Sequence, residues 1–509
     1  MRAPKSRRQA PPLPWTNASC FSPSLASEGA PEPVHACGDA ASPRRSPAWI
    51  ASTVGRAARE TSVSARCVSR SGESRNFPCG DVSRPSSRAS CDILRGMRNP
   101  LSFAVSEAAR VWLLAAAVVA TTPAVHALQP DAASPAATMS RLDAPVFAAG
   151  EGGHPFYRIP AATRLAGGAH RGRILAFAEG RGTLADNGAN DIVLRTSDDL
   201  GATWSPVRTI CDIAGRSLNN PCVAEVRDGR HAGRVILMFQ SYPEGCGEGC
   251  VAEGYESTGE KDTICRTLVM HSDDGGATWS APREVTREVK RAVGATSVAT
   301  GPGVGIQLAN GAHAGRVVMP FNEGPYDRWR VYAAFSDDGG DSWRIGAVAP
   351  NPPKGLGNEV QMFERADGAV VLNARQHLGA KRRTAAVSTD GGATWSQLAD
   401  VPELPDPQCM GGVLGLGGGT VVFTGCDSES RRALGTVWIS RDDGRRWPEK
   451  VLIEPEGFAY SVPVDLGRVA DGRHEIGVLY EGAGYRRIDF VRVRLPAAPP
   501  TAPQPSDGI

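Results

Sequence analysis

The sequence predicts an all-β protein whose strands form a β-propeller. Three observations carry this prediction: one eight-residue motif recurs five times, a short apolar segment precedes every copy, and glycine is abundant, at 58 of 509 residues. No long helical periodicity occurs after residue 130. Short strands that recur at roughly 50-residue intervals are typical of propeller blades, and about 350 residues then make six or seven of them.

The repeated motif has the pattern Ser-x-Asp-x-Gly-x-x-Trp and predicts a tight turn between two strands. Its copies occupy residues 197–204, 272–279, 336–343, 388–395 and 440–447, with starts 75, 64, 52 and 52 residues apart. Asp bonds to nearby backbone groups and Gly accepts positive φ, so both favour hairpin turns. Because five equivalent copies cannot all line one site, we interpret their aspartates as structural.

Apolar segments place the strands in order along the chain. The segments that enter the five motifs are 192–194, 267–270, 331–335, 385–387 and 437–439. Further strands are expected at 173–178, 234–239, 316–321, 369–373, 420–424 and 475–480. Strands grouped in this way between turn residues complete the predicted blades.

The first 127 residues carry the targeting signal. Residues 1–96 are rich in Arg, Ser and Pro, and we expect a disordered or misassigned extension there. Residues 97–127 combine a basic start at Met97, an apolar run of ten at 111–120 and the small-residue pattern Val125-His126-Ala127. This predicts a signal peptide and a secreted or periplasmic protein, with an uncleaved anchor as the alternative. The run is too short for a permanent membrane span.

Charge and cysteine content narrow the function further. The net charge of +2 gives no field that would attract nucleic acid. Cys246, Cys250 and Cys265 share one Gly/Glu-rich segment, where export permits a local disulfide. A zinc site is less favoured, because no Cys-x-x-Cys pair or histidine cluster accompanies them. The Pro/Ala-rich residues 496–509 are expected to form a disordered tail, which leaves 140–495 as the propeller domain.

Several motifs resemble one enzyme family. The eight-residue repeats are similar to the Asp boxes of sialidases, and Phe156-Tyr157-Arg158-Ile159-Pro160 resembles the sialidase Tyr/Phe-Arg-Ile-Pro motif. The resemblance runs in order through about residues 145–495, and its further segments are 220–222, 301–303, 310–311, 358–359, 372–375, 459–461 and 479–481. It implies a six-bladed propeller and an exo-α-sialidase that removes terminal sialic acid from glycoproteins, gangliosides and oligosaccharides. No metal or cofactor, no nucleic acid and no membrane span are implied, and we expect a monomer.

The carboxylate of sialic acid favours arginines in the binding site, because a planar guanidinium binds a carboxylate at two points. By resemblance, Arg158 and Arg375 are the first two members of a triad. The third precedes the last Asp box, where Arg431 and Arg432 are adjacent. The spacing to Thr436 and Ser440 favours Arg432, although the family's Asn between them is missing.

The carboxylate of sialic acid is attached to the anomeric carbon, which the nucleophile attacks. It would repel a negatively charged Asp or Glu nucleophile, so it favours a neutral one. A tyrosine with a pKa near 10 needs a base in contact with it. Sialidases are the known tyrosine exception among glycoside hydrolases. By resemblance, Tyr460 is the nucleophile and Glu359 is its base.

An acid must protonate the departing oxygen and later activate water. The family places this aspartate in the loop before the first Asp box, which here contains Asp186 and Asp191. We favour Asp186, because Asp191 directly precedes a strand. Glu481 resembles the family's carboxylate that orients the first arginine, so we expect it to pair with Arg158; a solvated strand end is the alternative.

Two features concern the rest of the pocket. The Gly/Glu-rich loop 242–265 suits the pocket rim, where it would contact the leaving group or the glycerol chain. Asn220 stands where relatives have an Asp before Pro, so the acyl form of the preferred sialic acid stays open.

Three other functions are compatible with a propeller. A sialic-acid-binding lectin would keep the Asp boxes but would not need Tyr460, Glu359 and Asp186 together. A trans-sialidase would share all catalytic residues. A glycosidase acting on neutral glycans would have no use for three arginines.

Overall fold

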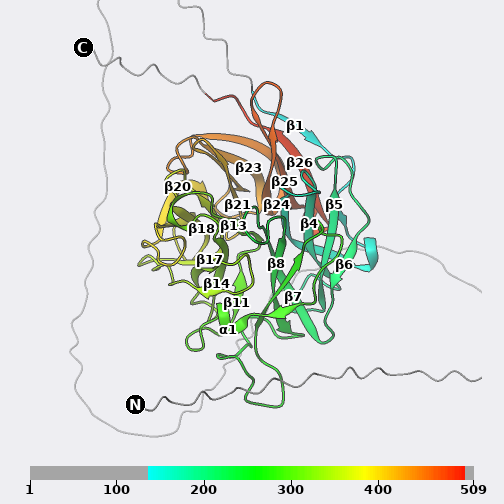
Figure 1. Ribbon diagram of the computed structural model, residues 1–509, viewed down its shortest axis with the longest axis vertical. Helices are drawn as coiled ribbons and strands as arrows, with labels where there is room; N and C mark the ends of the chain where they lie inside the picture. Colours follow the sequence, from blue (N-terminus) through cyan, green and yellow to red (C-terminus); the bar gives the residue numbers. More distant parts are fainter. Residues whose placement is uncertain (1–135, 499–509) are drawn as a thin grey trace, which may run out of the picture. The chain divides into compact units, whose positions relative to one another are not determined.

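The computed structural model describes residues 136–498, which form a nearly all-β domain (Figure 1). The predicted extension, the predicted signal peptide and residues 499–509 of the predicted tail lie outside the described residues. None of the helices within 136–498 has the length and apolar character needed to cross a membrane.

The first four sheets follow one another along the chain. The first contains β3 (Phe156–Arg164), β4 (Ile174–Arg181), β5 (Asn190–Ser197) and β6 (Arg208–Cys211). The second contains β7 (Arg216–Glu225), β8 (Val235–Pro243), β9 (Arg266–Ser272) and β10 (Arg283–Glu284), with β12 (Gly303–Val304) parallel to β7. The third contains β11 (Val298–Thr300), β14 (Val317–Glu323), β15 (Arg330–Ser336) and β16 (Arg344–Ile345), with β13 (Ile306–Gln307) beside β14. The fourth contains β17 (Leu356–Glu364), β18 (Val370–His377), β19 (Arg382–Ser388) and β20 (Ala399–Pro405).

The long strand β24 (Glu449–Arg468) joins the last two groups into one sheet. Its first half pairs with β23 (Ala433–Ser440), which continues to β22 (Thr420–Cys426) and β21 (Gly412–Gly417). Its second half pairs with β25 (His474–Gly482), which continues to β26 (Arg487–Arg494) and β1 (Thr138–Arg141), with β2 (Phe147–Ala148) beside β26. Within residues 136–498 the antiparallel pairing therefore sorts into six groups of four main strands.

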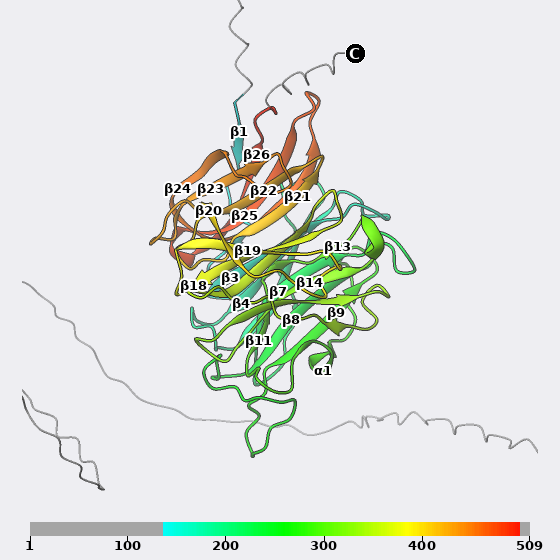
Figure 2. The same ribbon diagram turned by 90° about the vertical axis from the view of Figure 1, so that its left-hand side faces the viewer.

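These groups succeed one another around a common centre in chain order, from teal through green and yellow to orange (Figure 1). In the view turned by 90°, strands β21 to β26 lie above β7, β8 and β9 (Figure 2). β1 supplies the outer strand of the last group, and β3 of the first group contacts both β7 and β24. The predicted β-propeller is confirmed. Helical structure among the described residues is limited to α1 (Thr286–Val289), η1 (Glu151–Gly153), η2 (Gly311–His313) and η3 (Ala483–Tyr485).

Each Asp box connects the third strand of its group to the fourth, as the hairpin interpretation requires. In the first box the Ser197 hydroxyl accepts the Gly201 N–H at 2.8 Å, and Asp199 accepts the Thr203 N–H at 2.9 Å. These bonds satisfy the turn internally. The box tryptophans then pack between neighbouring groups: Trp204 contacts Phe490, and Trp279 contacts Phe177, with ring centroids 5.5 and 5.7 Å apart.

The innermost strand of four groups contains a β-bulge, which lies close to the beginning of β3, β7 and β17 and at the start of the second half of β24. The register shifts lie between Arg158 and Ala161 in β3, Asn219 and Cys222 in β7, Gly357 and Val360 in β17, and Phe458 and Ser461 in β24. A bulge re-aims the side chains of its strand, and bulges recur beside active sites. The four bulges turn residues from four different groups toward one end of the central axis.

Candidate active site

The bulged parts of these four strands border a pocket of about 590 Å³. Its lining includes Arg158, Asp186, Glu359, Arg375 and Tyr460, which are residues predicted from the sequence as functional. They come from β3, the β4–β5 loop, β17, β18 and β24. Side chains separated by up to 302 positions in the chain therefore lie around one cavity.

Tyr460 and Glu359 are in direct contact. The Tyr460 hydroxyl donates a hydrogen bond to Glu359, and Arg375 contacts the same pair, at 2.7 Å to the carboxylate and 3.1 Å to the phenolic oxygen. Tyr460 is 5% exposed and Glu359 is 9% exposed. Burial, and then the Glu359 charge, raise the pKa of Tyr460 well above its ordinary value, although three arginines oppose this. The phenol therefore keeps its proton in the unliganded protein and has an acceptor for it within reach.

Arg158 forms the expected pair with Glu481. The carboxylate accepts from Nε at 3.0 Å and from a terminal nitrogen at 3.2 Å, and it also accepts the Ile159 N–H at 2.9 Å. Burial opposes the charge of Arg158, but Glu481 and then Tyr460 outweigh it and raise its pKa. The guanidinium is thus a fixed cation, 5.3 Å from the Tyr460 ring centroid.

The two adjacent arginines before the last Asp box lie in different surroundings. The Arg432 guanidinium is 5.3 Å from the Tyr460 ring centroid and donates to the Tyr485 hydroxyl and the Gln408 carbonyl, both at 2.9 Å. Arg431 is exposed, and within the described residues its hydrogen bonds are made by its backbone alone, to Ser428 and from Ala433. The structure therefore places Arg432, and not Arg431, at Tyr460. The other charged side chains there are Arg158, Glu359 and Arg375.

The two aspartates considered for the role of the acid, Asp186 and Asp191, also lie in different surroundings. Asp186 lines the pocket with a side chain that is 76% exposed, 2.8 Å from Arg181 and 3.5 Å from Arg158. Asp191 instead faces Asp212 and His154, away from the pocket lining. Burial, and then Asp212, raise the pKa of Asp191 to about 6.

Sequence reasoning missed a buried ion pair beneath Asp186. Arg181 donates to Glu179, and both side chains are almost completely buried. Glu179 also accepts the Asn220 N–H at 2.7 Å, while Asn219 donates to the Asp186 carbonyl at 2.9 Å. A signal was available, because Glu and Arg end a strand that is otherwise apolar, and charges in such a strand need partners.

The loop 242–265 reaches the pocket, as expected from the sequence. Gly247, Glu248 and Gly249 belong to the lining. Cys246 and Cys250 form the predicted local disulfide, whereas Cys265 is free and buried. Glu248 and the buried Trp329, also in the lining, were not singled out from the sequence, since their chain neighbourhoods contain no recognisable motif.

A second pocket, of about 410 Å³, lies at the other ends of the innermost strands. Its carboxylates are occupied by the backbone: Glu225 accepts the N–H groups of Ala166 and Gly167, and Glu364 accepts those of Ala309 and Asn310. Glu225 and Glu364 therefore anchor loops at this end, in contrast to the contacts at Tyr460.

The chain is similar to known proteins over most of the described region. The family model of the BNR repeat-like domain matches residues 172–471. A sialidase of Micromonospora viridifaciens is 31% identical over 77% of this chain and 59% of its own length, and Sialidase-2 of Mus musculus is 30% identical over 68% and 94%. The chain thus spans less than two thirds of the bacterial relative and nearly all of the mouse relative.

Solved structures support the same fold. The Hadza microbial sialidase Hz136 gives a TM-score of 0.60 at 23% identity, covering 69% of this chain and 68% of that one. The intramolecular trans-sialidase of Ruminococcus gnavus gives 0.58 at 20% identity, covering 70% and 98%. These likenesses concern the fold, and it is the matched repeat domain and the curated relatives that show that the chain belongs to the sialidase family of glycoside hydrolases.

Proposed function

We propose that the protein is an exo-α-sialidase that hydrolyses terminal α-linked sialic acids with retention of anomeric configuration. The observation that carries the proposal is the contact of Tyr460 with Glu359 inside a pocket that also presents Arg158, Arg375 and Asp186. A lectin would need the arginines but would gain nothing from a buried tyrosine hydroxyl in contact with a carboxylate.

In the proposed binding step, Arg158, Arg375 and Arg432 receive the substrate carboxylate. Three guanidinium groups already surround the Tyr460 ring, and each remains charged at any physiological pH. Their combined donors exceed what Glu481, Glu359, Tyr460, Tyr485 and Gln408 accept. A planar carboxylate can therefore be bound without displacing these partners, and the anomeric carbon is brought next to the phenolic oxygen.

In the first chemical step, the Tyr460 oxygen attacks the anomeric carbon while its proton passes to Glu359. The bond to the leaving oxygen breaks, and Asp186 supplies the proton that this oxygen requires. In the second step, Asp186 removes a proton from water, the water oxygen attacks the anomeric carbon, and Glu359 returns the proton to the departing tyrosine oxygen. Two displacements at one carbon give net retention.

The test is Tyr460→Phe against a fluorogenic aryl sialoside. We expect turnover to fall by more than about a thousandfold, because the attacking oxygen is gone. Tyr332→Phe is the matched control, since it also removes a buried hydroxyl, one that donates to the Val289 carbonyl at 2.6 Å and does not belong to the pocket lining. Turnover by Tyr460→Phe equal to that of the control would refute the assignment of the nucleophile.

A further inference from the structure

Two buried, free cysteines of the described chain lie together at one end of a hairpin. β21 and β22 are antiparallel, with Gly412 opposite Thr424. Cys426 ends β22, and Cys409 lies three residues before β21, so both stand at the open end of this hairpin. They belong to the same buried cluster, with 4% of Cys409 and 2% of Cys426 exposed, and their thiols are hydrogen-bond neighbours.

Both cysteines are held in place by their surroundings. The Cys409 N–H donates to Asp406 at 2.9 Å, and the Cys409 carbonyl accepts from the buried Arg383 at 3.0 Å. The Cys426 thiol donates to the Phe458 carbonyl at 3.3 Å. Cys409, and then burial, raise the pKa of Cys426 well above its ordinary value. Two thiols fixed as neighbours at the end of one hairpin need only a short movement to reach the separation of a disulfide.

The chain on either side of this thiol pair positions Arg432. Gln408, which directly precedes Cys409, accepts from the Arg432 guanidinium at 2.9 Å. Phe458, whose carbonyl accepts the Cys426 thiol, donates its N–H to the Arg432 carbonyl at 3.2 Å. Burial opposes the charge of Arg432, but Cys409, and then two tyrosines, raise its pKa above the ordinary value, so the Cys409 sulfur lies close to the guanidinium. A bond between the two sulfurs therefore ties together the segments that hold Arg432.

We propose that Cys409 and Cys426 are a redox-sensitive pair that forms a disulfide by exchange with a low-molecular-weight disulfide such as oxidised glutathione. The bond closes the open end of the β21–β22 hairpin. Disulfides persist in the oxidising compartments to which the predicted signal peptide would direct the chain.

The exchange takes place in two steps. The thiolate of one cysteine attacks a sulfur of glutathione disulfide, which forms a mixed disulfide and releases one glutathione thiolate. The thiolate of the other cysteine then attacks the protein sulfur of the mixed disulfide and releases the second glutathione thiolate. The two protein thiols thus lose two protons and two electrons, and the glutathione disulfide takes them up as it becomes two thiols.

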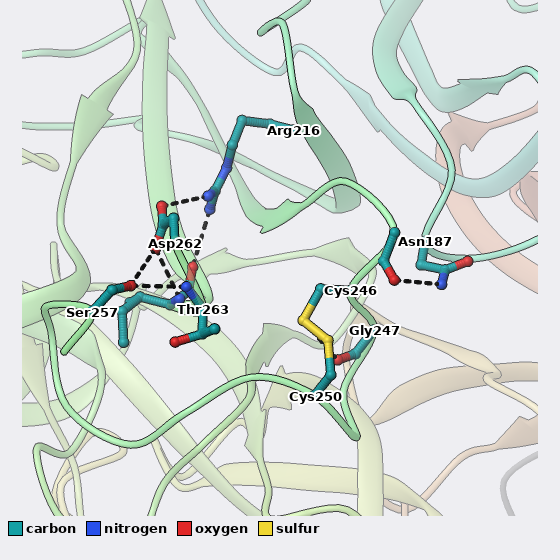
Figure 3. The surroundings of a disulfide bond; sticks show 10 residues. Asn187, Arg216, Cys246, Gly247, Cys250, Ser257, Asp262 and Thr263 are labelled. Atoms are coloured by element: carbon teal, nitrogen blue, oxygen red, sulfur yellow. Dashed lines mark hydrogen bonds and ion pairs between the residues drawn. A yellow bond between two sulfur atoms is a disulfide. The ribbon is translucent and has the colours of Figure 1, made fainter. Parts of the chain in front are cut away.

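Other cysteines of the described chain provide internal comparisons. Cys246 and Cys250 already form a disulfide (Figure 3). Cys222 is completely buried, and its thiol contacts the Met319 sulfur at 3.9 Å instead of a second cysteine. New disulfide formation should therefore join Cys409 to Cys426 and leave Cys222 as a thiol.

The experiment equilibrates the full chain with mixtures of reduced and oxidised glutathione that range from reducing to oxidising. A parallel set is refolded from urea in the same buffers, because both thiols are buried in the folded protein. The samples are quenched with acid, denatured, alkylated and digested for peptide mapping without reduction. A linked peptide that contains Cys409 and Cys426 should accumulate as the mixture becomes more oxidising, while Cys222 stays alkylated throughout.

Thermal unfolding measures the consequence for the fold. Formation of the Cys409–Cys426 bond should raise Tm by about 4 °C, the shift expected for closing a loop of this length in a domain of this size. Cys409→Ala and Cys426→Ala should each lose this additional rise, whereas Cys222→Ala, the matched control, should keep it. Any contribution of the Cys246–Cys250 bond is common to all variants and cancels in the comparison.

The absence of the linked peptide from both sets at every glutathione ratio overturns the proposal. A linkage that involves Cys222, or an equal response of Tm in wild type and the variants of Cys409 and Cys426, does the same. If an alanine variant does not fold, peptide mapping of the wild-type chain decides alone. Neither measurement requires turnover, so a failure of the proposed sialidase function would leave the result for the thiol pair intact. Only the benefit to Arg432 rests on that function, and oxidised protein should therefore keep activity on an aryl sialoside longer during heating than reduced protein.

Discussion

At the residue scale, the protonation of Tyr460 is determined by its burial and by the charges around it. Tyr460 lies against one carboxylate and near three guanidinium groups, which have opposite effects on its pKa, and burial decides the balance in favour of the protonated phenol. The arginines also receive the substrate's charge in the proposed function. When a carboxylate occupies them, less of their field reaches the phenol, so proton removal at the moment of attack depends on Glu359.

The roles of the two aspartates predict a dependence on the leaving group. Asp186→Asn should lower kcat/KM for sialyllactose by about 10²–10⁴-fold, because an alkoxide cannot depart without a proton. An aryl sialoside should lose much less, since a phenolate departs unaided. Parallel kinetics on both substrates check this, and Asp191→Asn is the control that should remain near wild type. Equal losses on the two substrates would contradict the role of Asp186 as the acid.

Substitutions of the adjacent residues Arg431 and Arg432 should have different effects on KM. Arg432→Ala should raise KM for an aryl sialoside by about 10–100-fold, the loss of a charge-assisted hydrogen bond to the substrate carboxylate. Arg431→Ala should leave KM unchanged, because Arg431 is exposed. A larger effect of Arg431→Ala than of Arg432→Ala would reverse the assignment.

At the scale of the element, the Asp-box hairpin explains the repeats and their spacing. Every copy links a third strand to a fourth, and its glycine lies where the neighbouring group approaches. A Cβ at Gly201, where φ is +85°, would lie 2.3 Å from the Phe490 ring. Glycine is therefore required at position 201 for two reasons. Its φ is positive, and a side chain there would collide with Phe490, which packs against Trp204 between the first and last groups.

Filling the position of Gly201 should therefore destabilise the fold in two ways. Gly201→Ala should cost about 1–2 kcal/mol for the left-handed backbone and about 1–3 kcal/mol more for overpacking against Phe490. Gly215→Ala is the matched control, since Gly215 has φ of +73° and no atom within 4 Å of the added Cβ. Thermal unfolding should therefore give the lower Tm for Gly201→Ala, with unchanged KM in both variants. Equal Tm values would show that the contact with Phe490 carries no packing cost.

The strands were predictable from the sequence, and several details of the site were not. Apolar segments between Gly-rich turns located β4, β8, β14, β18, β22 and β25 to within a few residues. The choice between Arg431 and Arg432 was open because β23 has a register shift at Ala433 and Leu434 has φ of +55°, so strict alternation does not apply there. Glu248 could not be found, because a Gly-rich loop has no periodicity from which its direction can be inferred.

At the scale of the whole molecule, the propeller brings together residues that no single sheet could supply. Bulges in β3, β7, β17 and the second half of β24 aim side chains from four groups into one pocket. The pairing of β1 with β26 completes the last group with the first described strand. This closure fixes β3 next to β24 and so holds Arg158 against Tyr460 and Glu481.

Retention through a tyrosine-linked intermediate is tested most directly by the anomer of sialic acid that is first released from an α-sialoside. Proton NMR during turnover should show the α-anomer of free sialic acid before mutarotation produces the β-anomer, because two displacements restore the starting configuration. An anhydro sugar in place of free sialic acid would assign intramolecular transfer instead of hydrolysis. Appearance of the β-anomer first would contradict the account.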